Sequence, residues 1–324
     1  MEASTALPLI WAGVIAFGVT LYVLLDGFSL GVGILFPFAD EGHDRATLMA
    51  TVVPVWDGNQ TWLVLGGASL FAAFPSAFNT LLSAFYLPLI VMLLALVFRG
   101  AAFEFRGKAA DPLPWDWAFA LGSVVAAFCQ GWVLGRYILG PGRADVIGFA
   151  AFTGAAVVCA YALLGCCWLV LKTRADLNGL ARAWGRRLLG AVLVGIAGVS
   201  AWTPLAEPAI ADRWFAWPNT FLLAPVPVLT IALAVTLYNS LLRGSDHGPF
   251  FLCLGLYLLT LSGLAISLWP YIVPRTVTVW QATSPPDTQL FLLYGVAIIL
   301  PLVLVYTAHA YYVFRGKVTE GEGY

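Results

Sequence analysis

Long apolar runs separated by short polar segments dominate the chain. The runs lie near residues 7–38, 50–74, 78–98, 116–139, 146–171, 187–205, 221–242, 249–273 and 290–314. A helix needs about 20 apolar residues to cross the hydrocarbon core of a bilayer, because each residue adds about 1.5 Å. The pattern therefore predicts an all-α integral membrane protein with nine transmembrane helices. We expect residues 1–324 to form a single polytopic membrane domain with short connections.

The composition agrees with a protein that is dissolved in lipid. Hydrophobic residues make up 61% of the chain and charged residues 10%, and the mean hydropathy is +0.88. Soluble globular domains carry about a quarter charged residues, so this chain cannot cover itself with a water-soluble surface. The net charge of −1 gives no reason to expect nucleic acid as a partner.

The distribution of Lys and Arg predicts the orientation of the chain. The first apolar run, in MEASTALPLIWAGVIAF, is not preceded by a basic residue, so we expect a retained helix and not a cleaved signal peptide. The segments after the first, third, fifth and seventh spans, together with the C-terminal segment, hold 12 of the 16 basic residues. Because basic loops stay in the cytoplasm, the N-terminus should face outside and the C-terminus the cytoplasm.

Two aspartates interrupt spans that are otherwise apolar. Asp57 lies in VPVWDGNQTW, beside Trp56, Asn59 and Trp62, and Asp26 lies in LYVLLDGFSLGVG. If both helices are straight, Asp26 lies about 18 Å and Asp57 about 15 Å from the cytoplasmic edge, so they are at similar depth, with Asp57 about two turns into its span. Ionisable groups at this depth are costly and usually mark ion or proton paths. The alternative is that each aspartate only fixes helix packing.

A third group of charges lies in FRGAAFEFRGK. Arg99 is expected at the end of the third span, and Glu104 can pair with Lys108 at a spacing of four residues if the helix continues. One interpretation is a basic membrane anchor with a solvated ion pair. The other is that Arg99 reaches a buried carboxylate or a cofactor propionate, with Arg106 nearby.

Residues suited to redox or hydrolytic chemistry are scarce. Haem iron usually takes His, Met or Cys as axial ligands, yet of the three histidines only His309 is expected inside a span, where we interpret it as a satisfied helix residue. The five cysteines show no metal-ligand spacing, so we expect small apolar fillers. We therefore expect no catalytic residue, no metal site and no directly bound cofactor in this chain.

Four segments together resemble the motifs of a known family. They are DGFSLGVGILFPF, VPVWDGNQTWLVLGGASLFAAFP, FYLPLIVMLLALVFRGAAFEFR and LWPYIVPRTVTVWQATS. Their order and spacing resemble subunit II of the cytochrome bd-type quinol oxidases, from the first span to the last. The short chain and the DGFS motif resemble those of the cyanide-insensitive branch of the family.

The resemblance implies a division of labour between two subunits. In that family, a partner subunit I carries the quinol-oxidation loop, two b-type haems and a third haem of d or b type. Subunit II is a haem-free partner folded as two four-helix bundles plus one further helix. The complex lies in the bacterial inner membrane, oxidises quinol and reduces dioxygen to water with protons from the cytoplasm. Small single-span accessory subunits and a structural quinone or lipid would also be compatible with it.

The resemblance also assigns roles to several residues of this sequence. Asp57 would relay protons along the subunit interface toward the oxygen-reduction site, and Asp26 would help to form that polar interior. Trp62, in the apolar part of the second span, would line an oxygen route, with Trp56 and Asn59 in support. Arg99, Glu104 and Arg106 match a segment near the cytoplasmic end where protons would be taken up.

One position departs from the family pattern. Many members read DGFD where this chain has DGFS, so Ser29 replaces a second carboxylate. A pathway that relies on two carboxylates in the first span is therefore in doubt here.

Two other functions remain open. An ion-coupled secondary transporter would use Asp26 and Asp57 to bind the coupling ion, and matched broken helices in the two halves would be expected. A purely structural scaffold would use the aspartates only for helix packing.

Overall fold

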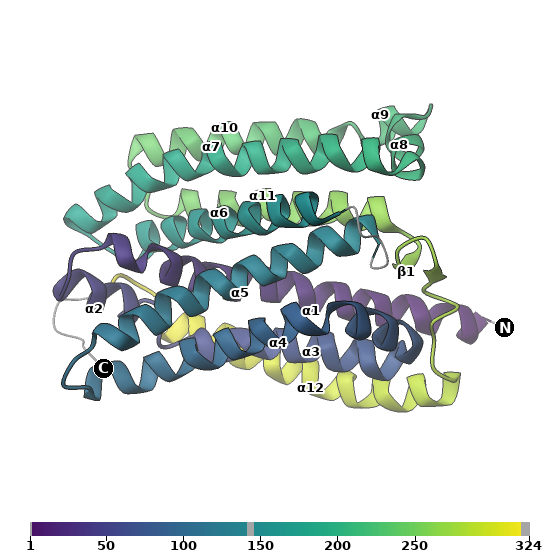
Figure 1. Cartoon of the computed structure of the whole chain (residues 1–324), viewed down its shortest axis with the longest axis horizontal. Helices are drawn as coiled ribbons and strands as arrows, with labels where there is room; N and C mark the ends of the chain where they lie inside the picture. Colours follow the sequence, from purple (N-terminus) through teal and green to yellow (C-terminus); the bar gives the residue numbers. More distant parts are fainter. Residues whose placement is uncertain (1, 141–145, 319–324) are drawn as a thin grey trace.

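The computed structural model describes residues 2–140 and 146–318. Long helices run side by side along one direction, and a short two-stranded ribbon lies at one end of them (Figure 1). The α-helices are α1 (Glu2–Leu35), α2 (His43–Ala50), α3 (Trp56–Ala73), α4 (Pro75–Phe105), α5 (Leu113–Leu139), α6 (Ile147–Lys172), α7 (Ala175–Ala206), α8 (Pro208–Phe215), α9 (Asn219–Leu223), α10 (Pro225–Arg243), α11 (Gly248–Leu268) and α12 (Pro286–Val313). The 3-10 helices are η1 (Phe36–Phe38) and η2 (Arg106–Lys108), and strands β1 (Tyr271–Val273) and β2 (Val277–Thr278) pair antiparallel.

Within the described residues, eight helices are long and apolar enough to cross a membrane. They match eight of the nine predicted spans. The remaining one, predicted at 50–74, begins with the last residue of α2 and a turn at 51–55 and continues as the separate helix α3. Pro54 lies in that turn, where its ring and missing N–H disfavour a continuous helix. Asp57 is therefore the second residue of α3 and not two turns inside a helix.

Two further boundaries differ from the prediction. Helix α7 begins at Ala175, so most of the polar stretch expected at 172–187 is helical. Helix α4 continues to Phe105, which places Arg99 inside the helix and not at its end. Hydropathy alone could not locate these boundaries, because a polar helical turn and a polar loop have the same composition.

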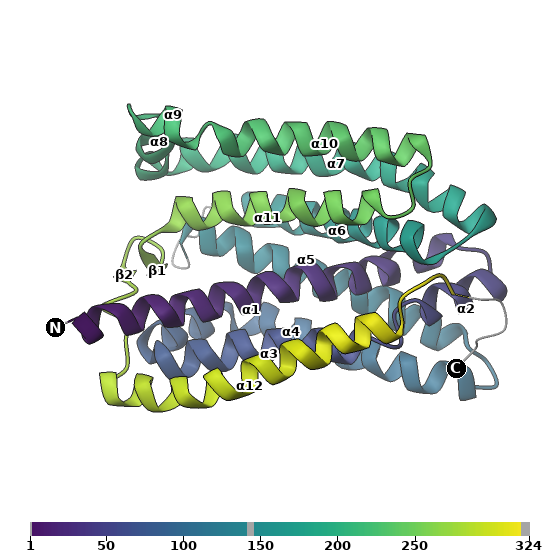
Figure 2. The ribbon, with the colours of Figure 1, turned by 180° about the vertical axis from the view of Figure 1, so that it is seen from behind.

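The helices pack in two groups. Helices α1, α3, α4 and α5 contact one another, as do α6, α7, α10 and α11, and contacts of α1 and α5 with α6 join the groups. Helix α12 lies along α3 and α1 at the outer edge of the first group (Figure 2). Only 6% of its most apolar window is buried, against 61% for α6. Helix α6 is thus central and α12 peripheral.

The two ends of the molecule differ in charge. Helix α1 begins at one end and α12 finishes at the other (Figure 1). The end of α12 lies with α2, the α4–α5 connection, the α6–α7 connection and the α10–α11 connection. We call this the basic end, because it holds most of the Lys and Arg residues. That the basic end faces the cytoplasm stays a prediction.

Helices α1 and α6 approach so closely that their backbones touch. A Cβ atom added to Gly31 would lie 1.9 Å from the carbonyl oxygen of Tyr161, and one added to Gly165 would lie 2.5 Å from the carbonyl carbon of Gly31. In a membrane, small residues allow such approaches and so increase van der Waals contact between helices. These two glycines therefore set the distance between the two helix groups.

We expect Gly31→Ala to destabilise the protein by about 1–3 kcal/mol, because the new methyl group must push α6 away. Gly13→Ala is the matched control in the same helix, since no atom lies within 4 Å of its added Cβ. The thermal midpoint of the purified protein with its natural partners would measure the difference. Equal midpoints for the two variants would contradict the role of Gly31.

Candidate functional site

A buried ion pair joins α1 to α4. Asp26 and Arg99 are both 0% exposed, and the Arg99 Nη1 lies 3.6 Å from the Asp26 Oδ1. Arg99 also donates to the hydroxyl of Ser29, and its guanidinium lies 5.3 Å from the ring centroid of Phe103. The interpretation of Arg99 as a solvated anchor is therefore wrong, and the alternative of a buried carboxylate partner is confirmed.

Ser29 determines the charge balance of this site. Its side chain is completely buried and occupies the position of the second carboxylate of the family pattern. With a serine there, one guanidinium faces one carboxylate. Because an unpaired buried charge is strongly destabilising, the one-to-one ratio ties Asp26 and Arg99 to each other.

A chain of hydrogen bonds lies beside this pair and crosses three helices. The Tyr22 side chain lies beside the Asp26 carboxylate. The Gln130 amide on α5 donates to the Tyr22 hydroxyl at 2.8 Å, and the Tyr161 hydroxyl on α6 donates to Gln130 at 2.7 Å. Sequence reasoning missed Tyr22, Gln130 and Tyr161. Each is a single polar side chain in an apolar run, and no spacing in the sequence connects them.

A second ionic cluster lies nearer the basic end. Asp116 on α5 accepts from Arg45 at 3.1 Å and also from Arg106. The two guanidinium groups lie 5.8 Å and 5.5 Å from the ring centroid of Phe36. Arg106 is therefore paired with Asp116 and not with the buried pair. Sequence reasoning missed Asp116, although the segment PWDW sets an acid between two tryptophans at the start of an apolar run.

An aromatic layer separates the two ionic clusters. The rings of Phe36 and Phe119 meet edge to face with centroids 5.0 Å apart, and both are fully buried. Arg99 lies over one side of this layer, 5.8 Å from Phe119, and Arg106 lies over Phe36. No hydrogen bond between described residues links the clusters through it. The shortest line from Arg106 to Asp26 is thus closed by apolar side chains.

Glu104 lies on the surface of α4. It pairs with Lys108 at 3.8 Å, and the two side chains are 69% and 76% exposed. The predicted ion pair between Glu104 and Lys108 is therefore confirmed, and it is exposed to solvent.

The start of α3 brings several predicted residues together. Trp56 stacks on Phe103 of α4 with ring centroids 4.6 Å apart. Asn59 is buried, donates to the carbonyl of Leu25 at 2.9 Å and accepts from the Tyr311 hydroxyl at 2.8 Å. Because Leu25 precedes Asp26, the first turn of α3 lies at the level of Asp26, as we expected from spacing. The carboxylate of Asp57 nevertheless lies on the exposed surface.

Trp62 lies one turn further along α3. Its indole is completely buried between α3 and α1, where Phe17 meets it edge to face at 6.0 Å. A passage for oxygen along Trp62 stays a prediction.

The described residues contain no group of three or more His, Cys, Asp or Glu side chains placed to hold a metal ion. Cys166, Cys167 and Cys253 are buried and free, in agreement with the role of apolar fillers. His309 lies on the exposed side of α12 and not within the bundle, so its interpretation as a satisfied helix residue stays a prediction.

Comparison with known families identifies the family of this chain. The sequence profile described as "Cytochrome bd terminal oxidase subunit II" matches residues 7–314. The chain belongs to the cytochrome bd terminal oxidase subunit II family. The family predicted from the four motifs is thereby confirmed, whereas the cyanide-insensitive branch stays a prediction.

Individual relatives match along nearly the whole chain. The chain is 30% identical to "Cytochrome bd ubiquinol oxidase subunit 2" of Bacillus subtilis, over 93% of this chain and 94% of that protein. It is 27% identical to "Cytochrome bd-I ubiquinol oxidase subunit 2" of Escherichia coli K12, over 97% and 96%. The fold is similar to that of a chain in "The structure of bd oxidase from Geobacillus thermodenitrificans", with a TM-score of 0.77, 17% identity and coverage of 95% and 99%.

We expect Asp26→Asn to destabilise the protein by about 3–5 kcal/mol, because it leaves the Arg99 charge buried without a partner. The double variant Asp26→Asn/Arg99→Gln should lose less than the sum of the single variants. Glu104→Gln is the control on the exposed pair and should cost less than about 1 kcal/mol. The thermal midpoints of the two single variants, the double variant and the control would measure these losses of stability. Additive losses in the double variant would show that the pair is not coupled.

Proposed function

We propose that the chain is the haem-free second subunit of a quinol oxidase complex in the bacterial inner membrane. The complex would oxidise quinol and reduce dioxygen to water at haems held by subunit I. The observation that carries this proposal is the family match over residues 7–314. The two four-helix groups with α12 outside them agree with the two bundles and additional helix implied by the resemblance.

The face formed by α3, α4 and α12 is our candidate for the contact with subunit I. Asp57 and Thr61 are exposed on α3. Asp57 lies near the level of Asp26, which is nine residues before the end of α1, roughly 14 Å along that helix. A carboxylate exposed to lipid at that depth is costly. Val64 and Phe71 on the same helix are 68% and 60% exposed. A protein partner would cover both the charge and the apolar side chains.

We assign Asp57 the transfer of protons toward that partner. Trp56 and Phe103 stack on each other, and they are the sequence neighbours of Asp57 and Glu104. The stacking therefore brings the backbone at Asp57 near the backbone at Glu104, and both side chains are exposed. Proton uptake at Glu104 followed by transfer to Asp57 avoids the aromatic layer.

The buried pair receives a different role in this proposal. Asp26 and Arg99 neutralise each other and hold α1 against α4, and Asn59 ties the start of α3 to the same level of α1. The pair would thus position the helix that carries Asp57 and not conduct protons itself.

No observation favours the transporter alternative. A coupling-ion site would require Asp26 and Asp57 to share one cavity. Asp26 is buried against Arg99, whereas Asp57 is exposed on the outer face of α3.

Purification of the tagged chain in mild detergent tests the membership of the complex. We expect a second large membrane subunit and haem bands in the dithionite-reduced minus oxidised spectrum. A stable, colourless protein without a partner would contradict the proposal.

For the proton role, we expect Asp57→Asn to lower the oxygen-consumption rate at least about 10-fold, because a positioned proton-transfer group contributes about 10²–10⁴-fold. Haem content and subunit ratio should stay unchanged. Asp176→Asn is the matched control, since both aspartates are exposed in the first turn of a helix. A normal rate in Asp57→Asn would exclude this route.

A further inference from the structure

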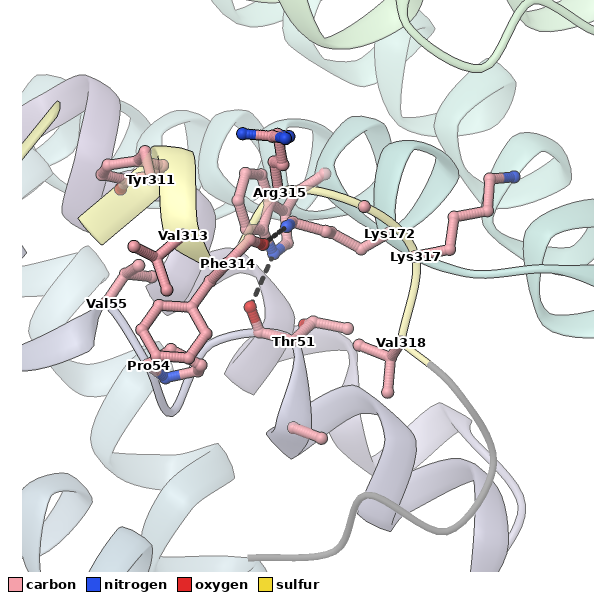
Figure 3. Close-up of a pocket in the computed structure, with 13 residues that line it drawn as sticks. Thr51, Pro54, Val55, Lys172, Tyr311, Val313, Phe314, Arg315, Lys317 and Val318 are labelled. Carbon is pink, nitrogen blue, oxygen red and sulfur yellow. Dashed lines mark hydrogen bonds between the residues drawn. The ribbon is translucent and has the colours of Figure 1, made fainter. Parts of the chain in front are cut away.

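A cavity of about 540 Å³ lies at the basic end, between the turn after α2, the end of α6 and the segment after α12. Figure 3 shows Lys172 reaching from α6 toward the backbone of Phe314, with Thr51 on the opposite wall. Arg315 and Lys317 also line the cavity. Among the described residues, the lining thus includes three basic residues and no acidic one.

Two of these cations have no carboxylate partner among the described residues. Lys317 pairs with Asp246 at 2.6 Å, and Arg182 occupies the other oxygen of that carboxylate at 2.7 Å. Lys172, by contrast, is only 8% exposed; it donates to the carbonyl of Phe314 and lies 4.9 Å from the Trp168 ring centroid. Arg315 lies over the Tyr312 ring. Lys172 and Arg315 therefore retain positive charge that an anion could balance.

The position of the cavity indicates the source of that anion. Lys172 is the last residue of α6, and the cavity follows the last turn of α12. Beside the cations, the end of α12 exposes Tyr312, Val313 and Phe314 by 64%, 54% and 41%. Cations at the membrane edge next to an exposed apolar helix suit a phospholipid. Its phosphate can contact the cations while its acyl chains pack along the apolar helix beside them. Basic pockets between helices at such an edge bind anionic headgroups.

We propose that this cavity binds the phosphodiester headgroup of an anionic phospholipid, with Lys172 and Arg315 as its charged partners and the acyl chains along α12. The site lies at the border of the face that we assign to subunit I, but it does not depend on that assignment. The Thr51 hydroxyl donates to Leu48, so the bound phosphate would be held mainly by the two cations.

Native mass spectrometry of the intact, delipidated complex tests this proposal with phosphatidylglycerol as the probe. We expect phosphatidylglycerol to bind and phosphatidylcholine to bind at least 10-fold more weakly. Each surface cation contributes about 1 kcal/mol, or about 5-fold, so Lys172→Gln/Arg315→Gln should weaken binding roughly 25-fold. Lys172→Arg should retain binding. Lys108→Gln is the control, because this lysine is 76% exposed outside the cavity.

Three results would overturn the proposal. They are equal binding of the two lipids, unchanged binding in the double variant, and displacement of the lipid by excess inorganic phosphate, which would identify a free phosphate site. Arg315→Gln alone changes an exposed side chain, so it keeps the test decisive if the Lys172→Gln variant fails to assemble. A partial loss in that single variant, about 5-fold, supports the proposal, and no loss contradicts it.

Discussion

The ion pair between Asp26 and Arg99 constrains everything around it, because neither charge is tolerated in the bundle without the other. Both side chains are 0% exposed and 3.6 Å apart, and separating them would leave an uncompensated charge in a low-dielectric interior. The pair therefore fixes α1 against α4 at one depth. Asn59, by donating to Leu25, holds α3 at that same depth.

This constraint divides the polar residues into two kinds with different consequences. Asp26 and Arg99 face inward as an ion pair and Arg99 also donates to Ser29, whereas Asp57 faces outward without such a partner inside the helix group. The aromatic layer of Phe36 and Phe119 keeps the inner pair apart from the charges at the basic end. The carboxylates of Asp57 and Glu104, by contrast, lie on the outer surface.

The break before α3 shows how a single local feature changes a functional interpretation. Pro54 interrupts the predicted span, so Asp57 belongs to the first turn of a helix and not to its interior. In that position the helix macrodipole favours a negative charge. The first turn of α3 nevertheless lies at the level of Asp26 on α1, because Asn59 donates to Leu25. The relative level of the two aspartates was therefore predictable from counting, whereas the direction of the Asp57 side chain was not.

The sequence by itself determined the membrane environment, the class of fold, eight spans and the family, because these follow from hydropathy, length and local motifs that need no tertiary contact. It also identified Asp26, Asp57 and Arg99 as unusual. Only the tertiary structure decided that Arg99 pairs with Asp26, that Arg106 pairs with Asp116, and that Tyr22, Gln130 and Tyr161 form one chain of hydrogen bonds. The physical reason is that each partner comes from a different helix. Their meeting depends on how the helices rotate and approach, and that is set by close backbone contacts such as the one at Gly31.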